Sequence, residues 1–208
     1  NQEVEKAVLA LGRRYVHHEA DLTKRTETKA VIPAVMEKMG DINILVNNAG
    51  IIRRSAAVDY SEEDWDATIE IDVTAAFILS QAAGRIMLKK GKGKIINIAS
   101  VLSFQGGMNV VAYSTAKHGI AGMTKALASD WAKHGINVNA IAPGFFVTEL
   151  TEALQKDQDR NKAITMRTPA GRWGEIADIT GSALFLASPA SDFVHGVVLP
   201  VDGGWMAL

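Results

Sequence analysis

The chain contains no cysteine among its 208 residues. Without cysteine there can be no disulfide framework, no thiol nucleophile and no zinc site with sulfur ligands. Its five histidines show none of the spacings at which metal ligands recur. We therefore expect an active site without a metal ion.

Charge of one sign and long apolar runs are also lacking. The formal net charge is -1, and no basic run is present, which argues against nucleic acid or an anionic membrane surface as partner. No apolar run approaches the ~20 residues that span a bilayer. The opening residues NQEVEKAV are charged, unlike a secretory signal. These features favour a cytoplasmic protein with no membrane partner.

What is present fits one soluble domain over residues 1–208, with 48% hydrophobic residues and hence a sizeable core. Periodicity makes strand-like and helical segments alternate along the chain. Strands are expected at 14–19, 42–46, 94–99, 137–141 and 197–201, and helices at 1–11, 23–39, 61–90, 111–133 and 175–186. This alternation predicts an α/β fold, in which a doubly wound parallel sheet carries helices on both faces.

Such a sheet binds ligands outside the carboxyl ends of its strands. Asp21, Asn48, Ser100 and Pro143 fall at or just after expected strand ends. We therefore expect these residues to gather along one edge of the sheet.

Ser100, Tyr113 and Lys117 form the most informative group. Tyr113 and Lys117 are four residues apart in the expected helix 111–133, so they share one helix face. A lysine ammonium favours phenolate, and Ser100 could hydrogen-bond the same substrate oxygen. The group suits general acid/base catalysis of alcohol–carbonyl interconversion. A lone Tyr-x-x-x-Lys pair more often reflects simple helix packing, so the neighbouring motifs decide whether this pair is catalytic.

Four motifs follow one another around this group: LVNNAG at 45–50, NIAS at 97–100, YSTAK at 113–117 and NVNAIAPGFFVT at 137–148. In these motifs the chain resembles the short-chain dehydrogenase/reductase family. The resemblance implies a three-layer Rossmann-type fold, a homotetramer, and hydride transfer between NAD or NADP and a secondary alcohol carbon. In that reaction Tyr113 moves the hydroxyl proton, Lys117 lowers the pKa of Tyr113, and Ser100 steadies the oxyanion. Tyr113 and Lys117 also face the nicotinamide ribose.

The resemblance further assigns cofactor contacts to three segments that follow strands. They are Asp21 and Leu22 for adenine, Asn48, Ala49 and Gly50 for the adenosine ribose, and Pro143, Gly144, Phe146 and Thr148 for the nicotinamide. Asp21 could equally cap a strand end. Asn47 is expected to be structural and to join neighbouring strands through its amide.

The family begins with a strand, a glycine-rich turn, a helix and a second strand, and this chain has no counterpart of them. A βαβ piece of this kind takes ~30 residues or more. We expect the 208 residues to be part of a longer chain, or else a fragment whose gap a partner fills. Neither pyrophosphate binding nor the choice between NAD and NADP can be placed on a residue here, although subgroup resemblance slightly favours NAD.

One position departs from the family pattern. Asp72 stands where the family commonly has asparagine, which holds a water in a proton relay largely through its backbone carbonyl. Asp72 keeps that carbonyl and adds a negative charge near Lys117. Our hypothesis is that the relay survives and that Asp72 belongs to the catalytic group.

Further stretches, including NNAGIIRR, NIASVLSFQGG, PAGRWG and VDGGW, resemble bacterial enzymes for sugar acids of the 2-deoxy-gluconate and 2-dehydro-3-deoxy-gluconate type. Guanidinium groups bind carboxylates bidentately, so Arg53 and Arg54 are candidates for the substrate's acid group. Gln105 could bind hydroxyls, beside Ser100 and Tyr113. Solvation or subunit contacts would explain the arginines equally well.

Two alternatives stay open. One is a 3-oxoacyl carrier-protein reductase or another polyol dehydrogenase of the same family. The other is a non-catalytic scaffold that uses the fold only for assembly.

Overall fold

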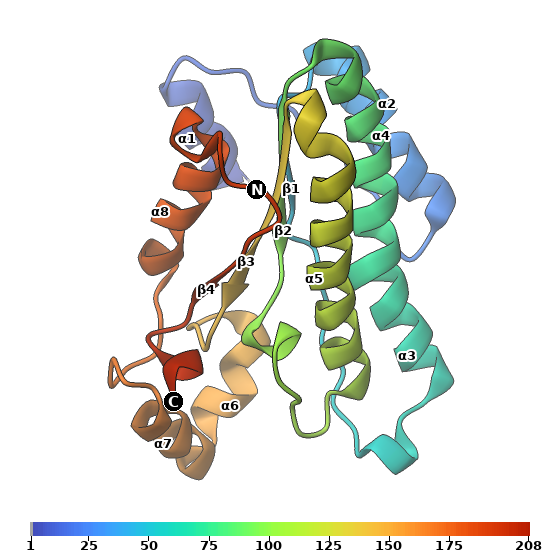
Figure 1. Cartoon of the computed structure of the whole chain (residues 1–208). Coiled ribbons are helices and arrows are strands. Elements are labelled where there is room, and N and C mark those ends of the chain that lie inside the picture. Colours follow the sequence, from blue (N-terminus) through green and yellow to red (C-terminus); the bar gives the residue numbers. More distant parts are fainter. Residues whose placement is uncertain (1) are drawn as a thin grey trace.

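The computed structural model describes residues 2–208 and forms three layers around a parallel sheet (Figure 1). Strands β1 (Ile44–Asn47), β2 (Gly93–Ile98), β3 (Ile136–Pro143) and β4 (Val198–Val201) are adjacent in this order. Each neighbouring pair is parallel, with Ile44 opposite Lys94 and Gly93 opposite Ile136. The doubly wound α/β architecture predicted from the alternation is therefore confirmed.

Helices cover both faces of this sheet. In chain order they are α1 (Gln2–Ala10), α2 (Arg25–Met39), α3 (Glu62–Ile69), α4 (Ala76–Lys90), α5 (Val111–Trp131), α6 (Glu152–Lys156), α7 (Gln158–Arg167) and α8 (Ile176–Ala187). Helices α4 and α5 lie on one face with α2 outside α4, and α8 lies on the other face (Figure 1). Asn1, included in the first predicted helix, lies outside the described residues.

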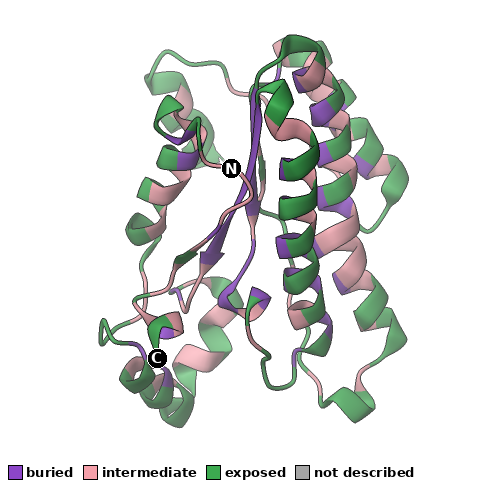
Figure 2. Cartoon of the chain, in the orientation of Figure 1, coloured by how far each residue is buried: buried purple, intermediate pink, exposed green. Residues whose placement is uncertain are grey.

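The two central strands are buried along most of their length (purple in Figure 2), and core clusters lie on both of their faces. Ile95 packs with Met87 of α4 on one face, and both are fully buried. Ile96 packs with Leu186 of α8 on the other face. Because helices cover both faces, these strands are buried at nearly every position, and even their polar residues Lys94, Asn97, Asn137 and Asn139 are buried.

The edge strand β1 differs from its prediction. We expected it to be buried on both faces, yet Ile44 and Val46 are 45% and 48% exposed. Within residues 2–208, β1 pairs only with β2. Residues 14–19, predicted as a strand, lie in no sheet, since a strand needs a neighbouring ladder for its backbone groups. The expected preceding βαβ segment stays a prediction.

The long helix after Ser61 is interrupted. The Ser61 side chain accepts a hydrogen bond from the Asp64 N–H at 3.1 Å, so the predicted cap is confirmed. A π-helical segment, Glu70–Ala75, then separates α3 from α4 and carries Asp72. π-helical segments are rare in proteins, and those that occur are often found at functional sites.

The helical stretch Glu62–Lys90 also has the length and composition of a membrane-spanning helix. Its most apolar window has a mean hydropathy of 1.3. α4 packs against β1, β2 and α2, so burial against the sheet accounts for its apolar face. One such helix is weak evidence for a membrane span.

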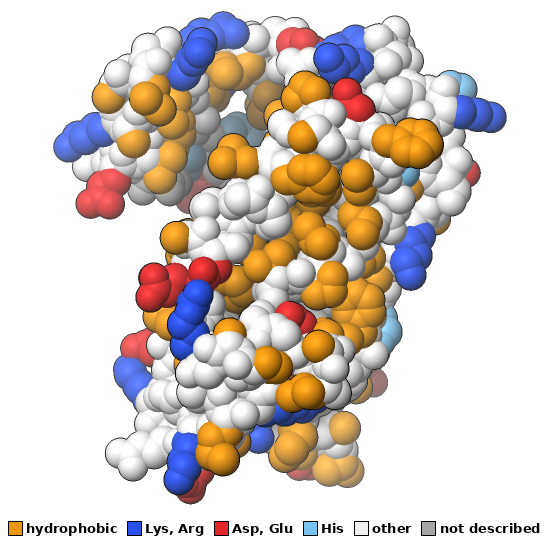
Figure 3. All heavy atoms as spheres, turned by 60° about the vertical axis from the view of Figure 1, so that its left-hand side comes forward, with side chains coloured by type: hydrophobic (Ala, Val, Ile, Leu, Met, Phe, Trp, Pro, Cys, Tyr) orange, Lys and Arg blue, Asp and Glu red, His pale blue; other side chains and the backbone are white. Residues whose placement is uncertain are grey.

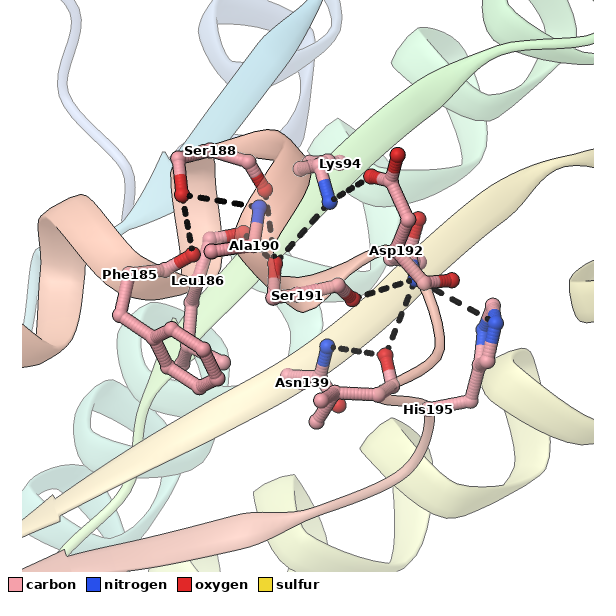
Figure 4. Close-up of polar contacts among 11 residues, drawn as sticks. Lys94, Asn139, Phe185, Leu186, Ser188, Ala190, Ser191, Asp192 and His195 are labelled. Carbon is pink, nitrogen blue, oxygen red and sulfur yellow. Dashed lines mark hydrogen bonds and ion pairs between the residues drawn. The ribbon is translucent and has the colours of Figure 1, made fainter.

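A polar network holds the segment after α8 at the start of the central strands, away from their carboxyl ends (Figure 4). Lys94 donates to Ser191 Oγ at 3.0 Å and pairs with Asp192 at 2.8 Å. Asn139 donates to the Val194 carbonyl at 2.9 Å. These contacts set the point at which the chain enters β4.

Gly135 is the glycine on which the turn before β3 depends. Its φ is 77°, and a Cβ there would collide with the carbonyl oxygen of Gly91. We expect Gly135→Ala to destabilise the protein by at least about 1–2 kcal/mol from the left-handed conformation alone. Thermal unfolding measures this, since 1 kcal/mol shifts Tm by about 2–4 °C in a chain of this size.

The matched control is Gly122→Ala within α5, where a Cβ would meet no heavy atom within 4 Å. It should be neutral or stabilise the helix by about 0.5–1 kcal/mol. Equal Tm values for the two variants would contradict the role given to Gly135.

Candidate active site

The predicted catalytic side chains meet at the carboxyl ends of β1, β2 and β3. Ser100 follows β2 directly and caps the short turn Val101–Ser103, while Tyr113 and Lys117 lie in the first turns of α5. That short turn packs against α5. The structure thus brings Ser100, Tyr113 and Lys117 to one edge of the sheet.

Ser103 ties the Ser100 turn to α5. Its hydroxyl donates to the Lys117 carbonyl at 2.6 Å and accepts from the Ser100 N–H at 3.3 Å. The Ser100 hydroxyl accepts from the Leu102 N–H at 3.1 Å. We did not single out Ser103 from the sequence, although the Ser-x-x-Ser spacing of a capping box was the available signal.

Lys117 is almost entirely buried and has three close neighbours. Its Nζ donates to the Ile98 carbonyl at 3.0 Å and lies 3.2 Å from Oδ2 of Asp72. The same Nζ is 5.2 Å from the centre of the Tyr113 ring. The ammonium is therefore held between a buried carboxylate and the phenol.

The pKa of Tyr113 differs from the expectation. Burial raises it above its ordinary value, and Lys117 only partly offsets this effect. The charge of Asp72 raises the pKa of Tyr113 further, whereas the Ser100 hydroxyl and the Arg54 guanidinium lower it. The lysine acts in the predicted direction, but desolvation of the phenolate is larger.

Asp72 itself is fully buried. Desolvation raises the pKa of its carboxyl, and this outweighs the opposing effects of Lys117 and of the Ile51 N–H. Oδ1 of Asp72 accepts from the Ile51 N–H at 2.8 Å. The family position predicted to hold a relay water thus also carries a buried carboxylate that contacts two segments.

The segment after β1 fits close approach of a ligand. Asn48, Ala49 and Gly50 are exposed at the strand end. A Cβ at Gly50 would lie 3.1 Å from Oδ2 of Asp72, so only glycine fits without a shift. The Asn47 amide donates to Asn97 Oδ1 at 2.8 Å, which confirms its structural role.

Asp21 caps the turn before α2. Its Oδ1 accepts from the N–H and the hydroxyl of Thr23, and Lys24 lies 3.3 Å from its other oxygen. The structure therefore favours the capping alternative for this carboxylate. Leu22, predicted to offer its backbone amide to adenine, lies in the same turn.

The loop after β3 is tightly built. Pro143 ends the strand opposite Val201, and a Cβ at Gly144 would lie 2.7 Å from Cα of Asp202. Phe146 is 7% exposed, so its side chain is core and only its backbone could hold a ligand. Thr148 caps the next short turn through Thr151.

Over residues 2–208, no three carboxylate or histidine side chains are placed to bind a metal.

The structure separates the two candidate arginines. Arg53 faces the half-exposed Asp64 at 3.5 Å. Arg54 instead donates to the Leu150 carbonyl at 3.4 Å and is near enough to Tyr113 to lower its pKa. Of this pair, Arg54 is the one whose charge acts on Tyr113.

Gln105 lies on the loop after Ser100 and contacts Arg167. The Arg167 guanidinium is 3.5 Å from the Gln105 amide oxygen and stacks 3.9 Å from the Trp205 ring centre. Arg172 is occupied by Asp178 in a bidentate pair. Gln105 and Arg167 therefore form a second polar edge near the Ser100 turn.

The chain is similar to known proteins over nearly all of its residues. A family model described as enoyl-(acyl carrier protein) reductase matches residues 1–206. The chain is 48% identical over 207 residues to the 2-dehydro-3-deoxy-D-gluconate 5-dehydrogenase of Dickeya dadantii, covering 99% of this chain and 82% of that protein. It is 50% identical over 205 residues to the Bacillus subtilis protein of the same name, covering 99% and 80%.

A solved structure is similarly close. The gluconate 5-dehydrogenase from Burkholderia cenocepacia, in complex with NADP and tartrate, superposes with a TM-score of 0.94 at 39% identity. The match covers 100% of this chain and 83% of the other. With its ordered motifs, its parallel sheet and these matches over nearly the whole of this chain, the chain belongs to the short-chain dehydrogenase/reductase family, as an NAD(P)-dependent oxidoreductase with a Rossmann-type fold.

Proposed function

We propose that this protein interconverts a secondary alcohol and a ketone on a sugar acid of the 2-deoxy-gluconate or 2-dehydro-3-deoxy-gluconate type. The observation that carries the proposal is the meeting of Ser100, Tyr113 and Lys117 at the carboxyl edge of the sheet, with the Arg54 charge near enough to lower the pKa of Tyr113. A cation at that place suits a substrate with a carboxylate close to the reacting carbon. Relatives at 48% and 50% identity carry names of sugar-acid dehydrogenases.

In the proposed reaction each residue has one task. The nicotinamide, when bound, accepts or supplies the hydride. The Tyr113 hydroxyl gives a proton to the ketone oxygen in reduction, and the phenolate takes it from the alcohol in oxidation. The Lys117 ammonium stabilises that phenolate, and the Ser100 hydroxyl donates a hydrogen bond to the same substrate oxygen.

The proposed cofactor contacts are those that follow the strands. The exposed run Asn48, Ala49 and Gly50 would hold the adenosine ribose, and the backbone of Gly144 and Phe146 would hold the nicotinamide. We propose NAD as the preferred cofactor from the subgroup resemblance. The Burkholderia relative contains NADP, which makes NADP the rival. Comparing kcat/KM for the two cofactors decides between them.

The proposal predicts different outcomes for the two neighbouring arginines. Arg54→Met should raise KM for 2-deoxy-gluconate about 10- to 100-fold, the worth of a charge-assisted hydrogen bond. Arg53→Met is the matched control and should change KM less than about twofold, because Arg53 forms only an exposed pair. Steady-state kinetics with a nicotinamide-linked assay measures both.

An uncharged polyol tests whether the carboxylate is what Arg54 recognises. The KM for the polyol should be unaffected by Arg54→Met, because the polyol has no carboxylate. Equal losses for acid and polyol, or equal effects of the two arginine variants, would contradict the assignment. Turnover of acyl thioesters in place of sugar acids would favour the carrier-protein reductase, and nucleotide binding without any turnover would favour the scaffold.

We further propose that the protein is a cytoplasmic homotetramer. The side on which α8 lies shows many hydrophobic side chains (Figure 3). Ile176, Leu184 and Phe193 are 59%, 71% and 100% exposed, on α8 and the segment that follows it. Large apolar side chains exposed on one side of a molecule favour a subunit interface there. Sedimentation equilibrium of the purified protein tests the proposed state.

A further inference from the structure

A second guanidinium lies near the Ser100 turn without a carboxylate partner. Arg167 ends α7, and across residues 2–208 its one polar neighbour is the Gln105 amide oxygen, 3.5 Å away. By contrast, Arg25, Arg53 and Arg172 each face a carboxylate. A guanidinium carries five N–H donors, so most of those of Arg167 are free to bind a ligand.

An aromatic ring holds this guanidinium in place. The central carbon of the Arg167 guanidinium lies 3.9 Å from the centre of the Trp205 ring, as in a cation–π contact. Trp205 is only 6% exposed, and its ring centre is 4.6 Å from that of Phe145. Arg167 itself is exposed. Stacking on a buried ring orders the guanidinium before a ligand arrives, which lowers the entropic cost of binding.

The Trp205 ring also belongs to the surroundings of the catalytic group. It packs in one hydrophobic cluster with Val101, the residue that follows Ser100. Gln105 lies on the loop that continues from the same turn. Because the Gln105 oxygen faces Arg167, its NH₂ group can donate to the same ligand as the guanidinium. Donors of this kind, one of them charged, suit a carboxylate.

The two arginines of the site are anchored at different places. Arg54 donates to the Leu150 carbonyl and its charge acts on Tyr113, whereas Arg167 is held by Trp205 of the C-terminal turn. In 2-deoxy-gluconate one carbon separates the carboxylate from the third carbon, and in 2-dehydro-3-deoxy-gluconate three carbons separate it from the fifth. Substrates that react at these carbons therefore present their acid groups at different distances from Tyr113.

We infer that Arg167, stacked on Trp205 beside Gln105, is a second carboxylate-binding subsite, which selects sugar acids whose acid group lies several carbons from the reacting carbon. The inference deepens the proposed function and rests on it for the identity of the substrates.

Kinetics with the two acids test this selection. Arg167→Met should raise KM for oxidation of 2-dehydro-3-deoxy-gluconate about 10- to 100-fold, the worth of a charge-assisted hydrogen bond. KM for 2-deoxy-gluconate and kcat for both acids should change less than about twofold, because Tyr113 and Lys117 are untouched. Arg160→Met, at an exposed arginine of the same helix, is the matched control and should leave both KM values unchanged.

A fluorescence titration makes the test independent of turnover. The chain has four tryptophans, so the emission difference between each protein and its Trp205→Phe counterpart isolates the ring under Arg167. Adding 2-dehydro-3-deoxy-gluconate to the unmodified chain should change this emission saturably. In Arg167→Met, half-saturation should need about 10- to 100-fold more ligand.

The two proposals fail in different ways. No turnover of either acid by the unmodified chain would contradict the proposed function, and the titration would then decide on the subsite alone. Equal rises in KM for both acids, an unchanged KM for 2-dehydro-3-deoxy-gluconate, or a titration that Arg167→Met leaves unaltered would overturn the subsite. Near-ultraviolet circular dichroism confirms that each variant is folded.

Discussion

Tyr113→Phe should lower kcat for the sugar acid about 10²–10⁴-fold, the range for loss of a general acid/base. The phenyl ring keeps the packing of α5, so nucleotide affinity and Tm should stay near those of the unmodified protein. Stopped-flow or steady-state reduction of the nicotinamide measures the loss. Tyr60→Phe is the control, because the Tyr60 hydroxyl contacts only the Arg53 carbonyl, at 3.4 Å.

The pH profile gives this prediction a second readout. Burial and Asp72 hold the pKa of Tyr113 above its ordinary range, although Lys117, Ser100 and Arg54 oppose them. Oxidation needs phenolate and should therefore speed up as the pH rises toward that pKa, whereas reduction needs the phenol and should slow above it. Residual activity of Tyr113→Phe should lack both limbs. A variant that kept the limbs would mean that another group moves the proton.

Lys117→Met should abolish turnover and also destabilise the fold. Removing the lysine leaves the Asp72 carboxylate buried without its counter-ion, which costs about 3–5 kcal/mol. At about 2–4 °C per kcal/mol, thermal unfolding should report a fall in Tm of ~6–20 °C at neutral pH. Turnover should fall as well, because the ammonium that stabilises phenolate is gone.

The loss of stability in Lys117→Met should depend on pH in a direction that the pKa of Asp72 sets. Burial raises the pKa of Asp72 in the folded protein above its ordinary value, so the folded state binds the proton more readily than the unfolded state. The deficit is therefore largest at neutral pH and shrinks as the pH falls through the raised pKa. A deficit that grew on acidification would contradict the assignment to Asp72.

Two further variants separate stability from chemistry. Lys117→Met combined with Asp72→Asn should recover most of the lost Tm, because no unpaired charge is left, yet it should stay inactive. Lys94→Met removes another buried lysine, but its partner Asp192 is 64% exposed. It should lower Tm less than Lys117→Met does, since water can solvate the carboxylate that remains.

Much of the site was predictable from local sequence. The spacing of Tyr113 and Lys117 places them on one helix face wherever that helix packs. Ser61 starts α3 and Gly40 ends α2, each through contacts within a few residues. The alternation of apolar runs predicted the parallel sheet, and parallel strands bring Asn48 and Ser100 to one edge.

Long-range packing decided the rest. Residues 14–19 have the composition of a strand, but a ladder partner is a tertiary property and none lies beside them in residues 2–208. Arg53 and Arg54 are adjacent in the chain, and only the folded structure sends one to Asp64 and the other toward Tyr113.

The chain by itself determined which groups can do chemistry, because residue type and helical spacing are local. The tertiary structure decided their protonation and their neighbours. Asp72 and Lys117 are remote in sequence, yet both are withdrawn from water and lie 3.2 Å apart. Burial and pairing of charge depend on what surrounds a side chain in space, and this is why the direction of the Tyr113 pKa followed from the fold and not from its motif.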